Sequence, residues 1–495
     1  MTSLADDTRD DTTAESSHLD RRVLTIAGVV VLGSIMSILD ITVVNVGMQT
    51  FTEAFDKTFA QVAWVATAYT LALATVIPLT GWAADRFGTK RLYMTAIVLF
   101  ALGSALCATA PDLAWLVAFR VIQGLGGGML MPLGMTILTR AAGPERVGRV
   151  MAVLGIPMLL GPIAGPILGG WLIDAANWHW IFLINVPIGV VALIYAFLAL
   201  DKDHVEPSES FDFVGMLLLS PGLALFLYGV SSIPSSQANH GTLWTSQVVI
   251  PAVVGLALIV AFVPWALRPA LRHPLMDLRL FLDRNMTISV VAIVIFTCAF
   301  FGSSLLFPQY FQQVRAETPL QAGVLLAPQG IGAMVTMPIA GVLADKLGSR
   351  WVVLPGVALI LVSLGMYATL DEATSYWFLL SALFVMGLGM GCTMMPLFSA
   401  AMATLREHTI ARGSTLINIV QQISASIGTA LFSVLLTNSI QNHLSGNPDT
   451  ALHEMSKGYA SSFLIATVCV AVVLVPALFL PKRGTGSGVA PAPMH

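Results

Sequence analysis

The chain has 495 residues, of which 56% are hydrophobic and only 10% are charged, and its formal net charge at pH 7 is −3. Soluble domains carry roughly one charged residue in four, so this composition excludes a soluble globular protein. A mean hydropathy of +0.82 indicates an integral membrane protein instead. The four cysteines have no paired spacing, so we expect no disulfide framework and no metal site. The sequence has no phosphate-binding Gly-x-x-x-x-Gly-Lys-Ser/Thr motif, so we expect no ATP hydrolysis. No other cofactor and no nucleic-acid partner are expected.

Apolar runs separated by short charged breaks predict an all-α protein, because about 20 apolar residues in a helix cross the hydrocarbon core of a bilayer. Fourteen transmembrane helices are expected. In chain order they are residues 23–47, 61–82, 92–110, 112–138, 148–172, 179–200, 211–232, 246–268, 286–311, 321–344, 351–370, 376–401, 412–437 and 458–480.

A repeated motif predicts that the chain is duplicated. The pattern P-x-x-G-x-x-A-D-R-x-G-T-K from Pro78 to Lys90 returns, 260 residues later, as P-x-x-G-x-x-A-D-K-x-G-S-R from Pro338 to Arg350. We therefore expect two six-helix bundles, residues 23–200 and 286–480, with two additional helices and a cytoplasmic linker in residues 201–285. Secondary transporters build two bundles around a central site from such repeats.

The positions of Lys and Arg predict the orientation, because these residues concentrate in cytoplasmic loops. With the N-terminus inside, 20 of the 24 basic residues fall on the cytoplasmic side and three outside, while Arg120 lies within a helix. Both ends, residues 1–22 and 481–495, are expected to be disordered and cytoplasmic, since they are polar or rich in Gly and Pro. The predicted location is the inner or plasma membrane.

Two charged residues lie deep within predicted helices. Asp40 is seven residues from the outer end of its span and Arg120 is eight residues into its own, about 10 and 12 Å at 1.5 Å per residue. A charge at such depth costs roughly 2.5 to 3.5 kcal/mol on insertion scales and usually marks function. The alternative is a structural ion pair. The duplicated position of Arg120 is Leu383, which favours function, and a proton taken up by Asp40 would loosen its hold on Arg120 or on a cationic substrate.

Five motifs in order resemble those of the fourteen-helix drug:proton antiporters of the major facilitator superfamily, and the match covers residues 23–480. They are L-D-x-T-V-V-N-V from Leu39, the loop from Gly81 to Arg91, R-x-x-Q-G-x-G from Arg120, G-P-x-x-G-G from Gly165, and F-L-I-N-V-P-I-G from Phe182. The resemblance implies multidrug efflux coupled to proton entry.

The resemblance also implies roles for residues. Asp40 would be the proton-coupling carboxylate and Arg120 the buried cation that tunes it. A cytoplasmic latch would comprise Gly81, Asp85, Arg86, Gly88, Lys90 and Arg91, with Asp345 and Arg350 from the repeat. The antiporter motif would comprise Gly161, Pro162, Gly165, Pro166, Gly169 and Gly170. A simple cytoplasmic anchor and ordinary close packing of small residues are the alternatives for these two sets.

Polar, aromatic and Met side chains on the predicted helices are the candidates for a substrate cavity, since such residues line adaptable pockets. They are Asn45, Gln123, Phe296, Phe300, Tyr310, Gln313, Met390, Asn418, Gln421 and Gln422. Packing or lipid contact is the alternative. Because Asp40 is the one acidic residue expected deep in a helix, the cavity suits lipophilic monocations and neutral amphiphiles.

The sequence thus predicts a secondary active transporter rather than an enzyme, whose partners are lipophilic small molecules, protons and the lipid bilayer. Two alternatives remain open: an exporter of one endogenous metabolite, lipid or siderophore on the same fold, and a non-transporting receptor or scaffold. Whether a periplasmic adaptor binds is not indicated.

Overall fold

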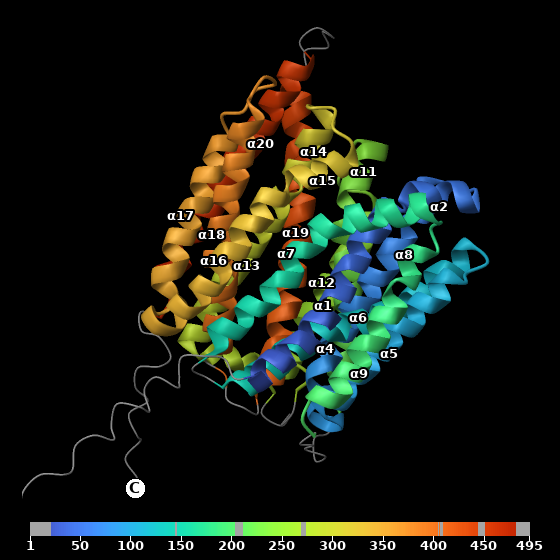
Figure 1. Ribbon diagram of the computed structural model, residues 1–495, viewed down its shortest axis with the longest axis vertical. Coiled ribbons are helices and arrows are strands. Elements are labelled where there is room, and N and C mark those ends of the chain that lie inside the picture. The colour runs from blue at the N-terminus through green and yellow to red at the C-terminus, as the bar shows by residue number, and fades with distance from the viewer. Residues whose placement is uncertain are drawn as a thin grey trace, which may run out of the picture.

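The computed structural model describes residues 21–143, 146–202, 211–268, 274–403, 405, 409–443 and 451–481. All regular elements in these ranges are helices (Figure 1). The first part contains α1 (Arg21–Val46), α2 (Met48–Phe55), α3 (Phe59–Val62), α4 (Trp64–Phe87), α5 (Thr89–Ala108), α6 (Leu113–Ala142), α7 (Val147–Ala175), α8 (Trp180–Leu183) and α9 (Asn185–Ala199). The middle part contains α10 (Phe213–Ser231), α11 (Ile233–His240), α12 (Ser246–Ala266) and the short 3-10 helix η3 (Leu278–Leu282). The last part contains α13 (Arg284–Ser304), α14 (Leu306–Gln313), α15 (Pro319–Leu325), α16 (Ala327–Leu347), α17 (Ser349–Tyr367), α18 (Tyr376–Met402), α19 (Ile410–His443), α20 (Ala451–Ala471) and α21 (Leu474–Ala477).

Thirteen helical segments of the described chain are long and apolar enough to span a membrane. Several predicted spans consist of two consecutive helices, such as α8 with α9, α13 with α14 and α15 with α16. The remaining predicted span, residues 148–172, falls on α7, a helix of 29 residues in which several side chains lie outside the described part. The all-helical membrane fold is confirmed, whereas the count of fourteen spans stays a prediction.

The helices form two bundles that meet along a seam. In Figure 1 the blue and green helices α1 to α9 lie on one side and the yellow to red helices α13 to α21 on the other. The first bundle is built on contacts of α6 with α4 and α5 and of α1 with α7, and the second on contacts of α18 with α16 and α17. Across the seam, α7 packs on α16 and α18, and α19 packs on α4 and α6. The predicted limit between residues 200 and 201 falls just after α9, whereas the one between residues 285 and 286 falls within the first turn of α13, which begins at Arg284.

The two additional helices, α10 and α12, pack closely on each other. A Cβ atom added at Gly255 would lie 2.6 Å from the carbonyl oxygen of Gly222, and one added at Gly229 would lie 2.6 Å from the backbone nitrogen of Ala252. Small residues allow such close approach of helices within a membrane. On its other sides α10 contacts α4 and α19, so this pair lies at the seam and touches both bundles.

The repeated motif has the same backbone in both halves. Gly88 ends α4 with φ of 94°, and Gly348 ends α16 with φ of 93°. Each glycine donates its N–H to the carbonyl four residues earlier, at 3.0 Å. A positive φ favours glycine, which has no Cβ to clash with the backbone. The repeat in sequence is therefore a repeat in structure.

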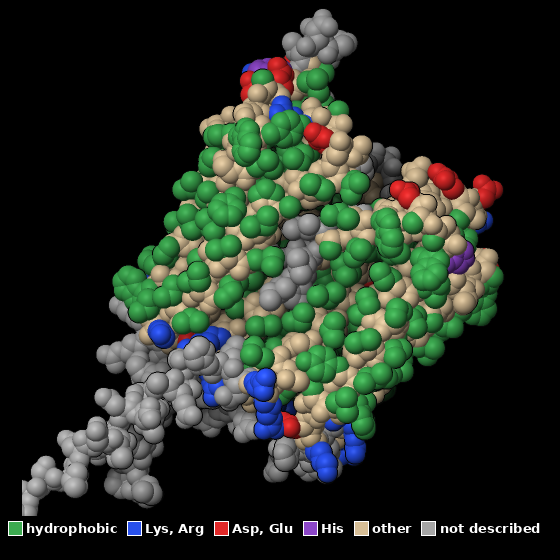
Figure 2. All heavy atoms as spheres, viewed as in Figure 1, with side chains coloured by type: hydrophobic (Ala, Val, Ile, Leu, Met, Phe, Trp, Pro, Cys, Tyr) green, Lys and Arg blue, Asp and Glu red, His purple; other side chains and the backbone are tan. Residues whose placement is uncertain are grey.

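Charged side chains separate toward the two ends of the molecule. Figure 2 shows Lys and Arg at the lower end, Asp and Glu mainly at the upper end, and a largely apolar surface between. The described chain begins and ends at the basic end: Arg22 pairs with Asp201 after α9 at 2.5 Å, and the carbonyl of Pro481 accepts a hydrogen bond from the N–H of Arg350. The tails expected to be disordered are residues 1–22 and 481–495. The structure places Arg21 and Arg22 in the first turn of α1, while residues 1–20 and 482–495 lie outside the described part.

The topology predicts which cysteines an impermeant maleimide reaches in intact cells. In a variant without the four native cysteines, we expect labelling of Glu53→Cys, in exposed α2, but labelling of Asp201→Cys only after permeabilisation. A fluorescent protein fused after residue 495 should fold in the cytoplasm, because fourteen spans place both termini on one side. Labelling of Asp201→Cys from outside, or an outward fusion, would contradict the predicted orientation or the even number of spans.

Candidate functional site

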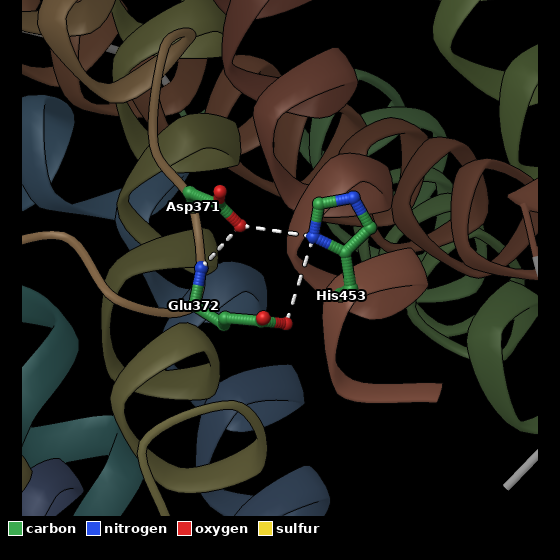
Figure 3. A group of neighbouring side chains, drawn as sticks. All are labelled: Asp371, Glu372 and His453. Carbon is green, nitrogen blue, oxygen red and sulfur yellow. Dashed lines mark hydrogen bonds and ion pairs between the residues drawn. The ribbon is translucent and has the colours of Figure 1, made fainter. Parts of the chain in front are cut away.

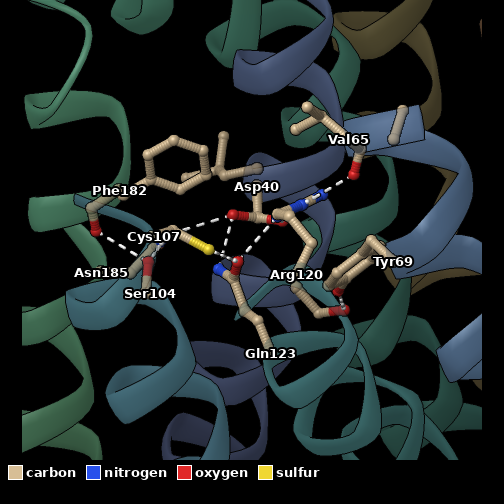
Figure 4. A network of polar contacts seen from close by, with 12 residues as sticks. Asp40, Val65, Tyr69, Ser104, Cys107, Arg120, Gln123, Phe182 and Asn185 are labelled. Atoms are coloured by element: carbon tan, nitrogen blue, oxygen red, sulfur yellow. Dashed lines mark hydrogen bonds and ion pairs between the residues drawn. The ribbon is translucent and has the colours of Figure 1, made fainter. Parts of the chain in front are cut away.

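Asp40 and Arg120 form a buried ion pair inside the first bundle (Figure 4). Asp40 comes from the C-terminal half of α1 and Arg120 from the N-terminal half of α6. The guanidinium NH1 of Arg120 lies 2.5 Å from Oδ2 of Asp40, and each residue is only 1% exposed. The structure thus brings together the two residues that were singled out from the sequence for their depth.

Neutral side chains complete the hydrogen bonds of the carboxylate. Gln123, one turn after Arg120, donates to Oδ1 of Asp40 at 2.7 Å and accepts from NH1 of Arg120 at 2.7 Å. Asn185, the first residue of α9, donates to the same Oδ1 at 3.4 Å and to Oγ of Ser104 at 3.1 Å. Ser104 of α5 in turn donates to the carbonyl of Phe182 in α8 at 2.8 Å. The carboxylate is held by side chains from two further helices, α6 and α9.

Arg120 is also held by α4. Its Nε donates to the carbonyl oxygen of Val65 at 3.0 Å, and its guanidinium carbon lies 4.2 Å from the centroid of the Tyr69 ring. The hydroxyl of Tyr69 hydrogen-bonds Oγ of Ser37 on α1 at 2.9 Å. Sequence reasoning did not assign roles to Tyr69, Asn185 or Ser104. Polar side chains within apolar spans are the signal that could have indicated them.

The network can respond to a proton. Taking two charges out of water is costly, and their mutual attraction offsets this cost only when further hydrogen bonds satisfy both groups. Here Asp40 accepts from three side chains, so its ionised form is fully bonded. Protonation of Asp40 would remove the anion and leave Arg120 as a buried cation, which forces a rearrangement or a new partner.

The two repeated loops make reciprocal contacts across the seam at the basic end. Asp85, at the end of α4, lies 3.7 Å from Nε of Arg412 at the start of α19, and 3.3 Å from Arg140 of its own bundle. Asp345, at the end of α16, accepts the N–H of Gly148 at the start of α7 at 3.0 Å and lies 3.8 Å from Arg149. Each aspartate thus reaches the first turn of a helix in the other bundle, where the positive end of the helix dipole also favours an anion.

Glycines allow α7 and α16, and likewise α4 and α19, to approach each other closely at this end. A Cβ at Gly341 would lie 2.7 Å from the carbonyl oxygen of Gly148, and a Cβ at Gly81 would lie 3.3 Å from that of Ala411. Near the second crossing, Oγ1 of Thr136 and Oγ of Ser414 hydrogen-bond at 2.7 Å. The two bundles therefore meet in direct backbone and polar contact at this end.

The other residues of the expected latch differ from the two aspartates in the contacts that the structure describes. Lys90 donates to the carbonyls of Phe197 and Leu200 at 2.7 and 2.6 Å, so it caps the C-terminus of α9. Arg86 is half-buried and Arg91 exposed, while Arg350 lies beside the ring of Trp351 at 5.9 Å. Sequence spacing alone could not separate Asp85, which contacts a helix of the other bundle, from Lys90, whose described hydrogen bonds go to the end of α9.

The glycines of the antiporter motif face α1 along α7. A Cβ at Gly161 would overlap Ile38, one at Gly165 would overlap Thr42, and one at Gly169 would lie 3.2 Å from Val43. Oγ1 of Thr42 also donates to the carbonyl of Gly161 at 3.1 Å. Gly170 differs, because nothing lies within 4 Å of its Cβ position. The side chains of Pro162 and Pro166 lie outside the described part.

Most of the predicted cavity residues of the second bundle lie in packing contacts. The rings of Phe296 and Phe300 stack at 5.4 Å and are buried, as is Met390. The hydroxyl of Tyr310 donates to the carbonyl of Asp371 at 3.2 Å.

The polar residues predicted to line a substrate cavity lie on several helices and have different surroundings. Gln313 accepts from the hydroxyl of Tyr459 at 2.8 Å, and Gln421 and Gln422 are half-buried on α19. Asn418 reaches across the seam to the sulfur of Met135 at 3.1 Å, and Asn45 is exposed near the end of α1. Gln123 belongs to the network of Asp40. The structure does not gather these residues at one place, and their role in a substrate cavity stays a prediction.

A second charged cluster lies between the α17–α18 connection and the start of α20 (Figure 3). Nδ1 of His453 is 3.1 Å from Oδ1 of Asp371 and 3.6 Å from Oε2 of Glu372. The N–H of Glu372 and the imidazole of His453, both hydrogen-bonded to Asp371, hold the pKa of that exposed carboxyl below its usual range. The three ligand atoms lie close enough to share a cation, but the hydrogen bond between His453 and Asp371 accounts for the arrangement.

The two neighbouring glycines of α7 give a matched test of the α1–α7 contact. We expect Gly165→Ala to reduce transport and thermal stability, because the added methyl group collides with Thr42 beside the backbone of α1. Gly170→Ala should change neither, since its Cβ position is open. Transport assays and melting curves of the purified variants would decide. Equal effects of the two substitutions would contradict close packing of α7 on α1 at Gly165.

The buried pair predicts non-additive stability. Arg120→Met leaves the Asp40 carboxylate without its cation and should destabilise the protein by about 3 to 5 kcal/mol. The double variant Asp40→Asn with Arg120→Met should recover most of this loss, because no unpaired charge remains. Unfolding in detergent followed by tryptophan fluorescence would measure both. If the losses of the single variants simply add, the two side chains do not act as a pair.

Comparisons with known proteins agree with this architecture. A family model described as Major Facilitator Superfamily matches residues 30–429. The multidrug resistance protein B homolog of Mycobacterium tuberculosis is 49% identical, over 96% of this chain and 93% of its own length. The multidrug export protein EmrB of Escherichia coli is 32% identical, over 83% of this chain and 80% of its own length.

Solved structures show the same fold at low identity. The human organic anion transporter MFSD10 aligns with a TM-score of 0.61 at 15% identity, covering 91% of this chain and all of that one. The fucose:proton symporter FucP of Escherichia coli aligns with a TM-score of 0.59 at 16% identity, covering 93% of this chain and 99% of that one. With its apolar helical segments, its duplicated bundles and these relatives, the chain is a multi-pass membrane transporter that belongs to the multidrug efflux family of the Major Facilitator Superfamily.

Proposed function

We propose that this protein is a proton-coupled antiporter that exports lipophilic, often cationic, compounds by alternating access, with the coupling proton on Asp40. One observation carries the proposal. An ion pair is buried at the heart of the first bundle, whereas the corresponding position of the second bundle is occupied by Leu383, which is fully buried in apolar surroundings. Because the fold packs an apolar residue at this position of the second bundle, it does not require the charge of Arg120. This favours a role for the ion pair in transport rather than in folding.

The expected cycle follows from the contacts. A proton arriving from outside neutralises Asp40 and ends its attraction to Arg120. The helices that hold the pair, α1, α4 and α6, then rearrange, and the contacts of Asp85 with Arg412 and of Asp345 with Gly148 open toward the cytoplasm. Release of the proton inside restores the ion pair and closes this end. The two bundles therefore expose the substrate site to one side at a time.

The range of substrates follows from the sparse charge and from the relatives. Asp40 is the one carboxylate deep within the spans of the described chain, because Asp85 and Asp345 lie at helix ends. One internal negative charge suits monovalent lipophilic cations, and neutral amphiphiles need none. Two relatives are named as a multidrug resistance homolog and a multidrug export protein, which supports a broad range rather than one endogenous metabolite.

Reconstituted protein tests the proposal directly. In proteoliposomes with an imposed pH gradient, we expect lipophilic monocations to cause proton movement with the wild type, and Asp40→Asn to abolish it. Substrate binding should stay measurable in the variant, because the amide keeps the shape of the carboxylate. Asp174→Asn, at an exposed carboxylate near the end of α7, is the control and should behave as the wild type.

Other outcomes are equally clear. Proton movement that persists in Asp40→Asn would remove Asp40 as the coupling site. Proton movement with one metabolite, lipid or siderophore and with none of a panel of lipophilic cations would indicate a dedicated exporter. If folded wild-type protein moves no protons with any substrate, it is not an antiporter, and a facilitator or scaffold remains.

A further inference from the structure

We propose that Tyr69 is a positioning residue that holds the Arg120 guanidinium when Asp40 is protonated, an inference that rests on the proposed function. In this arrangement α4 supplies the second set of partners for the cation, and α1 supplies the first. Protonation of Asp40 then transfers the hold on Arg120 from α1 to α4. Tyr69 would thereby set how readily the protonated state forms.

The geometry already places Arg120 between the two helices. On one side its NH1 contacts the carboxylate of Asp40. On the other side the Tyr69 ring lies 4.2 Å from the guanidinium carbon, and the carbonyl of Val65, one turn earlier on α4, accepts from Nε. The ring is 1% exposed, so water does not compete for the cation. A cation over an aromatic face is attracted most strongly when both are removed from water.

The surroundings keep the Tyr69 ring in place. A Cβ at Gly124 would lie 2.5 Å from the carbonyl oxygen of Tyr69, and one at Gly127 would overlap its hydroxyl group. Gly124 of the α6 motif therefore lets the backbone of α4 approach closely, and Gly127, just after the motif, leaves room for the hydroxyl end of Tyr69. Its hydroxyl bonds Ser37, and a side chain fixed in this way loses little freedom when it takes over the cation.

Few other groups face Arg120 in the described chain. The titratable or charged ones are Asp40 on α1, Tyr69 on α4 and Cys107 on α5, whose sulfur lies 3.6 Å from Oε1 of Gln123. From α8 the ring of Phe182 lies 5.8 Å from the guanidinium carbon. Once Asp40 is neutral, no other described acidic side chain contacts Arg120. The aromatic face of Tyr69, the Val65 carbonyl and the Gln123 amide oxygen are then its remaining partners.

This transfer would connect the proton site to the latch. Tyr69 and Asp85 lie on the same helix, α4, 16 residues apart, which is about 24 Å along its axis. When Arg120 loses its tie to α1 and keeps its tie to α4, the position of α4 relative to α1 changes. Asp85, at the far end of α4, then moves relative to Arg412 on α19.

The test follows proton-driven export of a lipophilic monocation in proteoliposomes as the pH on the outer side of the protein is lowered. Removing the ring leaves Arg120 with fewer partners in the protonated state, so Tyr69→Leu should move the half-maximal pH down by about one unit. Tyr69→Phe keeps the ring and should stay within about 0.2 units of the wild type. Tyr93→Leu is the control: Tyr93 is also buried in the first bundle, but its hydroxyl bonds the Val29 carbonyl, so the rate should fall without a shift.

Fluorinated phenylalanines at position 69 keep the test valid if Tyr69→Leu does not fold, because fluorine weakens the aromatic attraction for a cation without changing the shape of the ring. A graded downward shift with fluorination supports the proposal. The inference about Tyr69 is overturned if the half-maximal pH does not shift in Tyr69→Leu or in the fluorinated series, or if Tyr69→Phe shifts it as much as Tyr69→Leu does. Proton coupling by the wild type would stand in each of these cases. Absence of proton movement in the wild type overturns the proposed function and this inference together.

Discussion

A charge buried in a membrane protein must be paired, and this constraint organises the first bundle. Asp40 and Arg120 are both almost fully removed from solvent, and each separate charge would be costly in such surroundings. The side chains around them are consequently arranged to satisfy the pair: Gln123 bridges both, Asn185 and Ser104 extend the network to α8 and α9, and Val65 and Tyr69 extend it to α4. Six helices, α1, α4, α5, α6, α8 and α9, thus contribute to one polar network around the carboxylate.

The seam between the bundles obeys a second constraint, which is that helix backbones can approach closely only where side chains are absent. Gly81 and Gly341 lie at equivalent positions of the repeat, and each meets a helix start of the other bundle. Asp85 and Asp345, one turn further along, then reach the first turns of α19 and α7. The pairing is symmetrical because the sequence is duplicated. The buried ion pair has no such symmetry, since Leu383 stands in the second bundle where the first has Arg120.

Much of this could be predicted from the sequence, because the signals are local. Apolar length indicates spans, repeated glycines and aspartates indicate the two contact points between the bundles, and isolated charges in apolar runs indicate Asp40 and Arg120. Contacts between helices are harder to predict from the sequence, because packing in three dimensions decides how each helix is rotated about its axis relative to its neighbours. Lys90 therefore resembles a latch residue in sequence but caps α9, Gly170 resembles Gly165 but faces open space, and Tyr69 resembles any aromatic residue of a span. The residues predicted to line a substrate cavity lie scattered over both bundles, again because the rotation of each helix cannot be read from the sequence alone.

The position of α10 has a consequence for the energetics of the proposed cycle. A helix that contacts both α4 and α19 cannot keep both contacts unchanged while those helices shift against each other, so it must follow one and slide along the other. Close glycine packing binds α12 to α10, and the outer face of α12 presents apolar side chains such as Ile250, Val253 and Val260. Movement of this pair therefore displaces acyl chains. In the proposed cycle, part of the work of each turnover would thus be done on the lipid, and the thickness and lateral pressure of the bilayer would enter the rate of transport.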